Sequence, residues 1–531
     1  MPIATIDSKL CNGCGKCVDT CPEDVFRLDV QPIPAELMSP CATGCPAGIN
    51  VRKYSYCVEL DMLDEAIEAI REYNPFPAVT GRICPHPCEK KCARCEVDEP
   101  VNINCLERFV ADEFFGEHPQ PSRRIYAAPV AVVGSGPAGL SCAYFLSRKG
   151  YGVTVFEKEA TPGGMIGHAL PAFRLEQRVV DDQIRYLKEM GVEFRCGVEI
   201  GRDITLAELR SQGYGSVYLA IGLHSGGSLG IPGQDAAGVR PGVDFMKDVR
   251  LRDASIDGRI VVIGGGMIAA DVARTAKRRG ASSVHLFCLE DDDAMPMGES
   301  DRSECEAEGV VIHAGWGQTE VLEKDGKCTG IRFKKCLSVM DKGRFAPVFD
   351  ESVTETAECD HVLFCIGQKP CWGSMLNGTA VELSARDFVK ADPVTYQTAE
   401  PWIFAGGDVY TGQKFVVDAI GAGRQAAESI DRYLRGADLR EGRKDAVRVM
   451  TPPKNGITPF PRQNVPAGEA FDQNTARVEA MRCMTCGSRS VIAYPEDCMV
   501  CFYCERDCPM NAINVTPDRP GKRIAPWDLG Q

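Results

Sequence analysis

The chain has 531 residues, of which 44% are hydrophobic and 25% charged, and its formal net charge is −14. This length predicts three or four domains with sizeable cores. The acidic balance and the lack of a long lysine/arginine block exclude nucleic acid as an expected partner. No apolar run approaches the ~18–20 residues of a membrane span and no secretory signal precedes the first cysteines, so we expect a cytoplasmic protein. The 27 cysteines cluster at CxxC and CxxxC spacings near both ends, which favours metal clusters over disulfides.

The first motif in the chain is a run of four cysteines, and the same spacing is repeated near the other end of the sequence. The two copies read Cys11-x2-Cys14-x2-Cys17-x3-Cys21-Pro22 and Cys498-x2-Cys501-x2-Cys504-x3-Cys508-Pro509. Bacterial ferredoxins hold [4Fe–4S] clusters with this spacing, and the fourth cysteine binds a neighbouring cluster. We therefore expect two ferredoxin-like modules, at residues 1–30 and 477–531. The second opens with a shortened motif, Cys483-x2-Cys486.

Residues 31–125 read as a helical iron–sulfur domain. Apolar residues recur at helical spacing over residues 58–70, which predicts an amphipathic helix. Cysteines lie on both sides of that stretch, and those we expect to bind metal are Cys41, Cys45, Cys84, Cys88 and Cys92.

Strand–turn–helix alternation begins at Pro129 and predicts an α/β region. A buried strand at residues 130–133 leads into a glycine-rich turn made of Gly134, Ser135, Gly136, Pro137, Ala138 and Gly139. Such a turn lets the backbone approach a pyrophosphate, which then lies at the N-terminus of the following helix. A second strand ends in Glu157, placed to bind ribose hydroxyls. We expect a dinucleotide here.

A later stretch identifies this dinucleotide as FAD. Residues 398–408 end in Gly407 and Asp408 and resemble the second FAD motif of flavoproteins that bind two dinucleotides, in which the aspartate contacts the ribityl chain. The next stretch, residues 416–427, is predicted to be a helix whose N-terminus could face the flavin. A simple turn aspartate is the alternative for Asp408.

A second fingerprint follows the predicted strand at residues 259–263. It consists of Gly264, Gly265, Gly266, Met267 and Ile268. The next strand ends near Glu290, and a carboxylate there binds a ribose 2′-OH and repels a 2′-phosphate. Because no arginine pair follows that strand, we expect NAD(H) rather than NADP(H). Arg278 and Arg279 are explained as charges that complement a helix C-terminus.

Residues 41–435 resemble the small subunit of glutamate synthase and the flavin-containing N-terminal half of dihydropyrimidine dehydrogenase. The signatures that carry this resemblance are residues 74–77, 81–84, 134–139, 163–165, 170–175 and 294–296. The resemblance implies FAD, a nicotinamide cofactor and iron–sulfur clusters close to the flavin. For the whole chain we expect three to four [4Fe–4S] clusters. The resemblance extends the expected flavin contacts to Lys158, Gly164, Met165, Arg174, Gly222, Val417 and Ala419, and the nicotinamide contacts to Gly367.

The resemblance also implies how the cysteines group. One cluster falls on Cys45, Cys84, Cys88 and Cys92. An adjoining cluster in the family starts with a CxxC pair upstream of Cys41, which this chain lacks. Its last ligand would fall on Glu107, and the Cys11–Cys21 run is expected to replace the missing pair. Cys95 and Cys105 are spare thiols nearby.

Together these features predict two nested Rossmann-like domains of α/β class, preceded by the helical domain and flanked by the ferredoxin-like modules. The expected bounds are 126–222 for the first part of the FAD domain, 223–366 for the NAD(P) domain, 367–435 for the second FAD part and 436–476 for a linker.

The expected activity is hydride transfer between a nicotinamide and FAD, and single-electron transfer between FAD and the clusters. No side chain is expected to act as a catalytic acid, base or nucleophile. A ferredoxin or a larger redox complex would be the partner. The alternative is a relay and assembly subunit of a multi-subunit complex, including one that bifurcates electrons. A disulfide reductase is excluded, because residues 157–175 contain no cysteine and no CxxC lies between positions 106 and 482.

Overall fold

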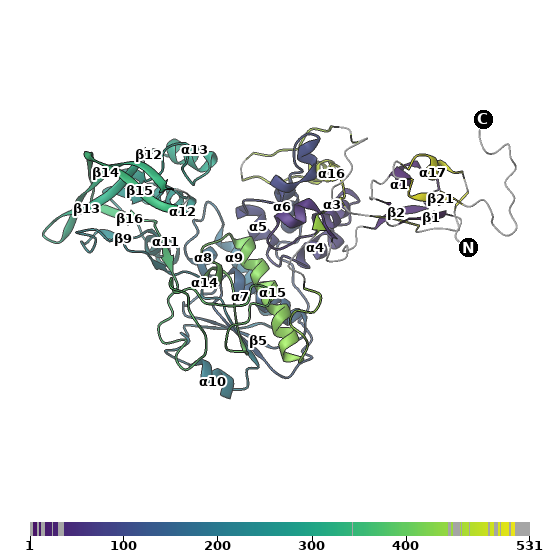
Figure 1. The fold of residues 1–531 in the computed structure, drawn as a ribbon, viewed down its shortest axis with the longest axis horizontal. Helices are drawn as coiled ribbons and strands as arrows, with labels where there is room; N and C mark the ends of the chain where they lie inside the picture. The colour runs from purple at the N-terminus through teal and green to yellow at the C-terminus, as the bar shows by residue number, and fades with distance from the viewer. Residues whose placement is uncertain are drawn as a thin grey trace. The chain divides into compact units, whose positions relative to one another are not determined.

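The computed structural model describes residues 4–7, 10–11, 16–23, 25–29, 37–341, 344–443, 448–449, 457, 459–466, 468–486, 489–492, 498–499, 501–508 and 511–515. Cys14 lies outside them. The chain divides into two compact units (Figure 1). The first comprises Met1–His118, Phe415–Arg424 and Asp438–Gln531, and the second comprises Pro119–Lys414 and Gln425–Ala437.

The second unit contains a parallel five-stranded sheet that carries the first glycine fingerprint. In spatial order its strands are β18 (Ile403–Ala405), β7 (Ser216–Leu219), β4 (Val130–Val133), β5 (Val153–Glu157) and β6 (Glu193–Cys196). Strands β4, β5, β7 and β18 are buried along their whole length, as expected of a parallel sheet covered on both faces. Helices associated with this domain are α7 (Pro137–Arg148), α8 (Gly164–His168), α9 (Gln177–Glu189), α10 (Leu206–Ser211) and α14 (Asp408–Thr411). Helix α15 (Val416–Leu434) belongs to the second unit from Gln425 onward and to the first unit before it.

A second parallel sheet carries the other fingerprint. Its spatial order is β12 (Val310–Ala314), β11 (Ser283–Cys288), β10 (Arg259–Ile263), β16 (His361–Phe364) and β9 (Val239–Pro241). Its helices are α11 (Gly242–Arg252), α12 (Met267–Arg278) and α13 (Glu299–Ala307). An antiparallel sheet of β13 (Trp316–Lys324), β14 (Lys327–Asp341) and β15 (Arg344–Glu358) contributes Ile331 and Phe333 to the same core.

The second domain is inserted into the first. The chain enters the insertion through β8 (Ser225–Gly226) and leaves it through β17 (Gln368–Lys369), and these two short strands pair with each other antiparallel. Gly222 and Gly367 precede them with φ of 63° and 62°, the left-handed conformation that glycine adopts without strain. The prediction of two nested dinucleotide-binding domains is confirmed.

A helical domain forms the larger described part of the first unit. Its elements are α2 (Pro40–Gly44), α3 (Val51–Glu59), α4 (Leu63–Arg71), α5 (Pro77–Ile83), η1 (Glu89–Lys91), η2 (Ala93–Glu96) and α6 (Ile103–Glu113), with the short parallel pair β3 (Leu37–Met38) and β19 (Arg448–Val449). The single helix expected over residues 58–70 is wrong. It is split into α3 and α4 because Asp61 adopts φ of 60°, which a continuous helix does not allow.

The two ends of the chain fold together into one small module. Strand β1 (Ala4–Ile6) pairs antiparallel with β21 (Ile513–Val515), and β2 (Phe26–Asp29) pairs antiparallel with β20 (Arg489–Ile492). Figure 1 shows α1 (Lys16–Thr20), from the start of the colour scale, beside α17 (Tyr503–Arg506), from its end. The expectation of two separate ferredoxin-like modules is therefore wrong: each half supplies one strand of each pair.

The stretch expected to be a linker is partly structured. Helix α16 (Gln473–Ala480) begins at Asp472, whose carboxylate accepts a hydrogen bond from the Thr475 backbone N–H at 2.9 Å. Phe471 just before it is buried, and α16 packs against α3 and α6. The second cysteine-rich segment therefore begins inside the helical domain and not at the terminal module.

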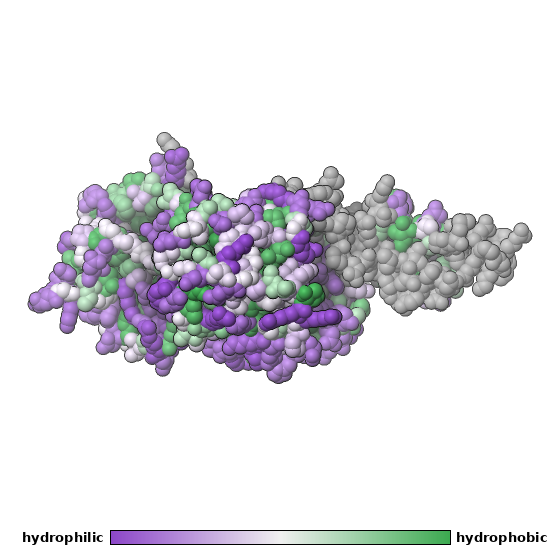
Figure 2. All heavy atoms as spheres, turned by 90° about the horizontal axis from the view of Figure 1, so that it is seen from below, coloured by the Kyte–Doolittle hydropathy of each residue, from purple (hydrophilic) through white to green (hydrophobic). Residues whose placement is uncertain are grey.

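Within the part of the chain that the structure describes, none of the helices combines the length and apolar character needed to cross a bilayer. The face in Figure 2 is dominated by hydrophilic side chains, with hydrophobic ones in small scattered groups.

Candidate functional site

The turn after β4 has the geometry of a pyrophosphate cradle. Gly134 adopts φ of 101°, and a Cβ there would lie 2.5 Å from the Ala220 carbonyl oxygen. A Cβ on Gly139 would lie 2.0 Å from the Gly134 oxygen, whereas one on Gly136 would meet no atom within 4 Å. Gly134 and Gly139 therefore allow the turn to close against its neighbours. Gly136 leaves open space at the first turn of α7, where Pro137 occupies the first helical position.

The predicted ribose-binding acid is held beside this turn. Glu157 is buried, and its Oε2 accepts hydrogen bonds from the Ser135 backbone N–H and hydroxyl at 3.0 and 2.5 Å. Its Oε1 accepts one from the Glu159 N–H at 2.9 Å. The Ser135 hydroxyl in turn accepts from the Gly163 N–H at 3.0 Å. A carboxylate offers about four acceptor positions, so Glu157 keeps acceptor capacity for ribose hydroxyls while it fixes the turn.

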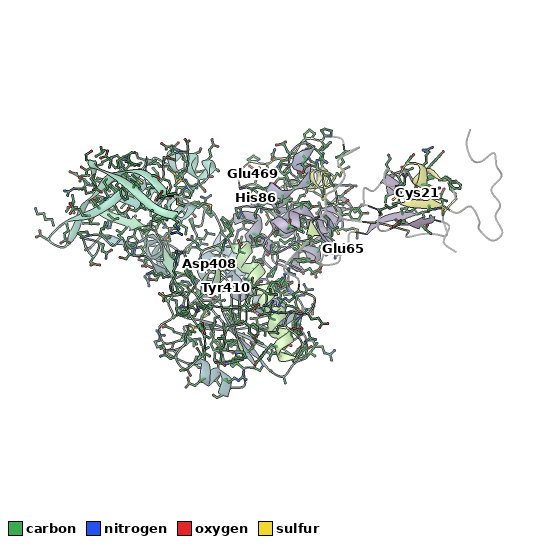
Figure 3. All side chains as sticks on the ribbon, in the orientation of Figure 1. Cys21, Glu65, His86, Asp408, Tyr410 and Glu469 are labelled. Atoms are coloured by element: carbon green, nitrogen blue, oxygen red, sulfur yellow. The ribbon has the colours of Figure 1, made fainter. Side chains whose placement is uncertain are left out.

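The residues predicted to contact the flavin at positions 407 and 408 follow strand β18. Strand β18 ends before Gly407, which has φ of 72°, and Asp408 opens α14. Figure 3 labels Asp408 and Tyr410 on this helix. The Asp408 carboxylate accepts a hydrogen bond from the Lys414 N–H at 3.3 Å. Gly164 lies against the first turn, because a Cβ on it would be 2.6 Å from the Gly136 Cα.

The remaining residues expected to contact the flavin lie in several different environments in the structure. Lys158 is exposed and Ala419 is buried. Met165 packs against the core of the inserted domain. The Arg174 guanidinium is bound by Asp271 of α12, at 2.8 Å, and by Asp301 of α13, so its charge is matched by the inserted domain rather than by the flavin turn. Val417 belongs to the first unit, where it lines a cysteine cavity.

The second fingerprint forms a comparable cradle after β10. Gly264 has φ of 136°, and a Cβ on Gly266 would meet no atom within 4 Å. Glu290 reaches back to this turn, since a Cβ on Gly265 would lie 2.9 Å from the Glu290 Oε2. Ile268 is partly buried and Met267 is 42% exposed at the start of α12. The pyrophosphate cradle and the ribose acid are thus adjacent, as nicotinamide dinucleotide binding requires.

The arginines at the far end of α12 take no part in this cradle. Arg278 pairs with Glu308 at 2.6 Å and Arg279 with Asp253 at 2.6 Å. These ion pairs and the position of both arginines at the end of α12 agree with the prediction that their charges complement the helix C-terminus.

Three groups of cysteines each surround a cavity in the first unit. Cys45, Cys84 and Cys88 line one of about 380 Å³ together with Thr80, Val417 and Glu107. Glu107 is buried, and its Oε1 accepts hydrogen bonds from Asn74 and Thr80 at 2.8 and 2.5 Å. Burial raises the pKa of Glu107 to about 7, although these hydrogen bonds favour its ionised form. Both bonds use Oε1, so Oε2 is left for a ligand in the cavity.

A second cavity, of about 340 Å³, is lined by Cys41, Cys92, Cys483 and Cys486. We call it the four-thiol cavity. Three expectations are corrected here. Cys92 does not line the cavity of Cys45, and Cys483 and Cys486 line a cavity of the helical domain. Glu107 likewise lines the cavity of Cys45 and not that of Cys41, so the two expected cluster sets exchange one member each.

The third cavity, of about 300 Å³, lies in the terminal module. Its thiols come from both runs: Cys21 from the first, and Cys498, Cys501 and Cys504 from the second. Figure 3 labels Cys21 in this module. Cys17 and Cys508 share one apolar cluster with Cys21, Cys498 and Cys504, and Cys11 is half-buried. A fourth cysteine that crosses to the neighbouring cluster is the pattern of two-cluster ferredoxins, which makes Cys11, Cys14, Cys17 and Cys508 the expected second set.

The chemistry of these sites fits iron–sulfur clusters. Among the described residues, no three His, Cys, Asp or Glu side chains lie close enough to hold a single metal ion. Cysteines that instead surround a cavity match cluster ligation, in which each thiolate binds a different iron of the cluster.

Comparison with known proteins shows the family. Residues 128–423 match the Pyridine nucleotide-disulphide oxidoreductase family. The chain belongs to this family. Residues 37–118 of this oxidoreductase match the dihydropyrimidine dehydrogenase domain II, 4Fe-4S cluster family, and residues 3–26 match a 4Fe-4S binding domain. The chain is therefore a FAD-dependent, nicotinamide-linked iron–sulfur oxidoreductase. Residues 157–175 of this member contain no cysteine.

Two relatives extend over most of the oxidoreductase. The NADP(+)-dependent formate dehydrogenase subunit beta of Moorella thermoacetica is 34% identical over 503 residues, covering 84% of this chain and 70% of the relative. The NAD-dependent dihydropyrimidine dehydrogenase subunit PreT of Escherichia coli K12 is 35% identical, covering 75% and 92%. Among solved structures, Mycobacterium tuberculosis FprA in complex with NADPH has a TM-score of 0.50 at 18% identity over 60% of this chain and 86% of FprA, which shows a shared fold.

Proposed function

We propose that the oxidoreductase is the nicotinamide-linked subunit of a larger redox complex, with its terminal module as the electron outlet. The observation that carries this is the cavity of Cys21, Cys498, Cys501 and Cys504, which builds a ferredoxin-like site from the two ends of one chain. Two of the most similar relatives are themselves named as subunits. A cytoplasmic location and a ferredoxin or other redox protein as the partner belong to the same proposal.

The residues of the chain bind and orient the cofactors. The turn at Gly136 and the carboxylates of Glu157 and Asp408 would hold FAD, and the turn at Gly266 would hold the nicotinamide dinucleotide. Bound FAD supplies the chemistry, because a flavin accepts a hydride and releases its electrons singly. Cys45, Cys84, Cys88 and Glu107 would hold the cluster of the first cavity, Glu107 as the family's non-cysteine ligand.

We propose NAD(H) as the preferred nicotinamide. Glu290 and the three aspartates after it, residues 291–293, follow β11 where a 2′-phosphate would lie, and a carboxylate there binds a 2′-OH and repels a 2′-phosphate. Relatives of either specificity exist, since one is named NADP(+)-dependent and another NAD-dependent. The acidic stretch is therefore the feature of this chain that supports NAD(H).

Two assays test these proposals on the full chain, purified anaerobically. With NADH as donor and a viologen dye as acceptor, we expect turnover, and a larger kcat/KM for NADH than for NADPH. Affinity purification from the native cell should retain further redox subunits. Absence of dye reduction with both nucleotides contradicts the nicotinamide-linked role, and recovery of the chain alone contradicts complex membership.

A further inference from the structure

The four-thiol cavity brings together cysteines from opposite ends of the chain. Cys41 and Cys92 come from the helical domain, whereas Cys483 and Cys486 follow α16. Cys41 is buried and the other three are half-buried. Four cysteines that line one apolar cavity match the ligand set of a thiolate-bound metal cluster, whose binding deprotonates them.

A buried positive charge faces the same cavity. Arg52 of α3 lines it and is 4% exposed, and its Nε and Nη1 have no hydrogen-bond partner among the described residues. A buried guanidinium with two nitrogens that lack a hydrogen-bond partner is unfavourable. Negative charge in the cavity would therefore stabilise the buried guanidinium of Arg52. A cluster bound by four thiolates supplies that charge.

The cysteine pair is held in place by a buried network. Arg482, just before Cys483, is fully buried and donates to Glu479 at 2.8 Å and to the carbonyls of Pro100 and Glu99 at 3.1 and 2.7 Å. It also pairs with Asp98 at 3.0 Å. These contacts fix the start of the CxxC pair against the loop that follows Cys92, so its position at the cavity is part of the fold.

We propose that Cys41, Cys92, Cys483 and Cys486 bind a [4Fe–4S] cluster whose negative charge is offset by Arg52. The pair after α16 thus replaces the CxxC that the family places upstream of Cys41, a role we first expected for the Cys11–Cys21 run. Four Fe–S bonds to the protein form as four bonds to a carrier's thiolates break. The four cysteine protons pass to the departing thiolates or to water, and no electron is transferred.

The inference rests on the iron–sulfur character of the proposed function, but it has its own readouts. The test uses the full chain produced anaerobically, with the double variant Cys483→Ser/Cys486→Ser and, as a control, Cys95→Ser. Cys95 is exposed and lines none of the three cavities. We expect the double variant to lose about four iron and four sulfide per FAD, one cluster's complement, and the control to lose none. Unchanged iron in the double variant, or zinc bound stoichiometrically to the wild type, would overturn the proposal.

A measurement on wild-type protein guards against misfolding of the variant. Cys41, Cys92, Cys483 and Cys486 should all resist alkylation in the holoprotein, and all four should react after oxidative removal of iron. Rapid alkylation of Cys483 and Cys486 before iron removal contradicts the assignment. Arg52→Gln should lower the midpoint potential of one cluster, since net charge sets such potentials. In the double variant nicotinamide should still reduce the flavin, because hydride transfer to FAD uses none of these thiols. Loss of iron with intact flavin reduction therefore tests the cluster assignment independently of the proposed function.

Discussion

Arg94 donates a hydrogen bond from its Nη1 to the backbone carbonyl of Arg482, at 2.9 Å. This bond ties the residue that follows Cys92 by two positions to the residue directly before Cys483. The same arginine forms a paired contact with Asp98 at 2.7 Å. A segment near the end of the sequence is thereby built into a domain near its beginning.

The carboxylate of Glu479 is the centre of this attachment. It accepts hydrogen bonds from Arg482, from the Asn102 N–H and from the Gln463 N–H, at 2.8, 2.7 and 2.7 Å. Glu479→Ala removes one of the two carboxylate partners of the buried Arg482 and leaves the Asn102 and Gln463 N–H groups without their acceptor. We expect a cost of about 3–5 kcal/mol. Hydrogen exchange of residues 460–486 should accelerate by at least a hundredfold. The control Glu469→Ala, at an exposed position labelled in Figure 3, should leave exchange unchanged. Equal exchange in both variants contradicts the attachment.

Substitutions at two glycines of the flavin turn should have different effects on stability and on FAD affinity. Gly139→Ala places a Cβ against the Gly134 oxygen, so we expect a loss of about 1–3 kcal/mol in stability through overpacking together with loss of FAD. Gly136→Ala adds a methyl group in open space at φ of −72°, so stability of the apoprotein should change by less than about 0.5 kcal/mol. FAD affinity should nevertheless fall at least tenfold, because the methyl group occupies the pyrophosphate's approach. Fluorimetric FAD titration and urea unfolding measure both quantities. Normal FAD affinity in Gly136→Ala would show that the cradle is misassigned.

Glu290 is expected to set nicotinamide affinity. Glu290→Ala removes the acceptor for the ribose 2′-OH, which costs about 1.5–3 kcal/mol for a charge-assisted hydrogen bond, a tenfold or greater rise in the KM for NADH. The KM for NADPH should fall, since a repulsive charge is removed. Asp293→Ala, on the same exposed stretch, is the control and should have a smaller effect on both. An unchanged NADH affinity in Glu290→Ala refutes the assignment.

A buried carboxylate at the end of α15 predicts a pH dependence of stability. Burial alone would raise the pKa of Asp431, but hydrogen bonds from Arg435, Lys149 and Tyr151 outweigh it and hold the pKa below its ordinary value. A depressed pKa contributes stability at pH values above the unfolded pKa of about 3.9, and that contribution is lost as pH falls through the folded value.

Asp431→Asn should therefore cost about 1–2 kcal/mol near pH 7, a discounted value because the Lys149 and Arg435 side chains are 35% and 46% exposed. The difference from wild type should shrink as pH falls below about 4. Urea unfolding of the two proteins at several pH values measures it. Glu428→Gln, which alters a more exposed partner of Lys149, should cost less. A pH-independent difference contradicts the role of the Asp431 charge.

Local patterns in the sequence predicted the two dinucleotide domains well. The strands that end at Val133 and Ile263 and the turns at Gly134 and Gly264 are each marked by neighbouring residues, an apolar run followed by glycines and a helix. Their pairing with β7 and β16 involves segments far along the chain. Asp61 was missed as a helix break because an aspartate with positive φ leaves no mark on helical periodicity.

The grouping of the cysteines could not be predicted from spacing. CxxC at Cys483 reads equally well as the start of a ferredoxin motif or as a detached pair, and spacing does not reveal which cavity it lines. The pairing of β1 with β21 is likewise set by tertiary contact between the chain ends. The sequence did contain one signal. It has an extra CxxC pair, Cys483 and Cys486, separate from the complete run at Cys498, and it lacks the CxxC pair expected upstream of Cys41.

The most direct test of the account is an anaerobic titration of the purified chain with NADH and then with NADPH, followed by absorbance. The account predicts that nicotinamide bleaches the flavin band and that cluster absorbance falls with it, in a total that exceeds two electrons per FAD. Bleaching of neither chromophore by either nucleotide would contradict the central claim that this chain joins a nicotinamide to iron–sulfur clusters through FAD.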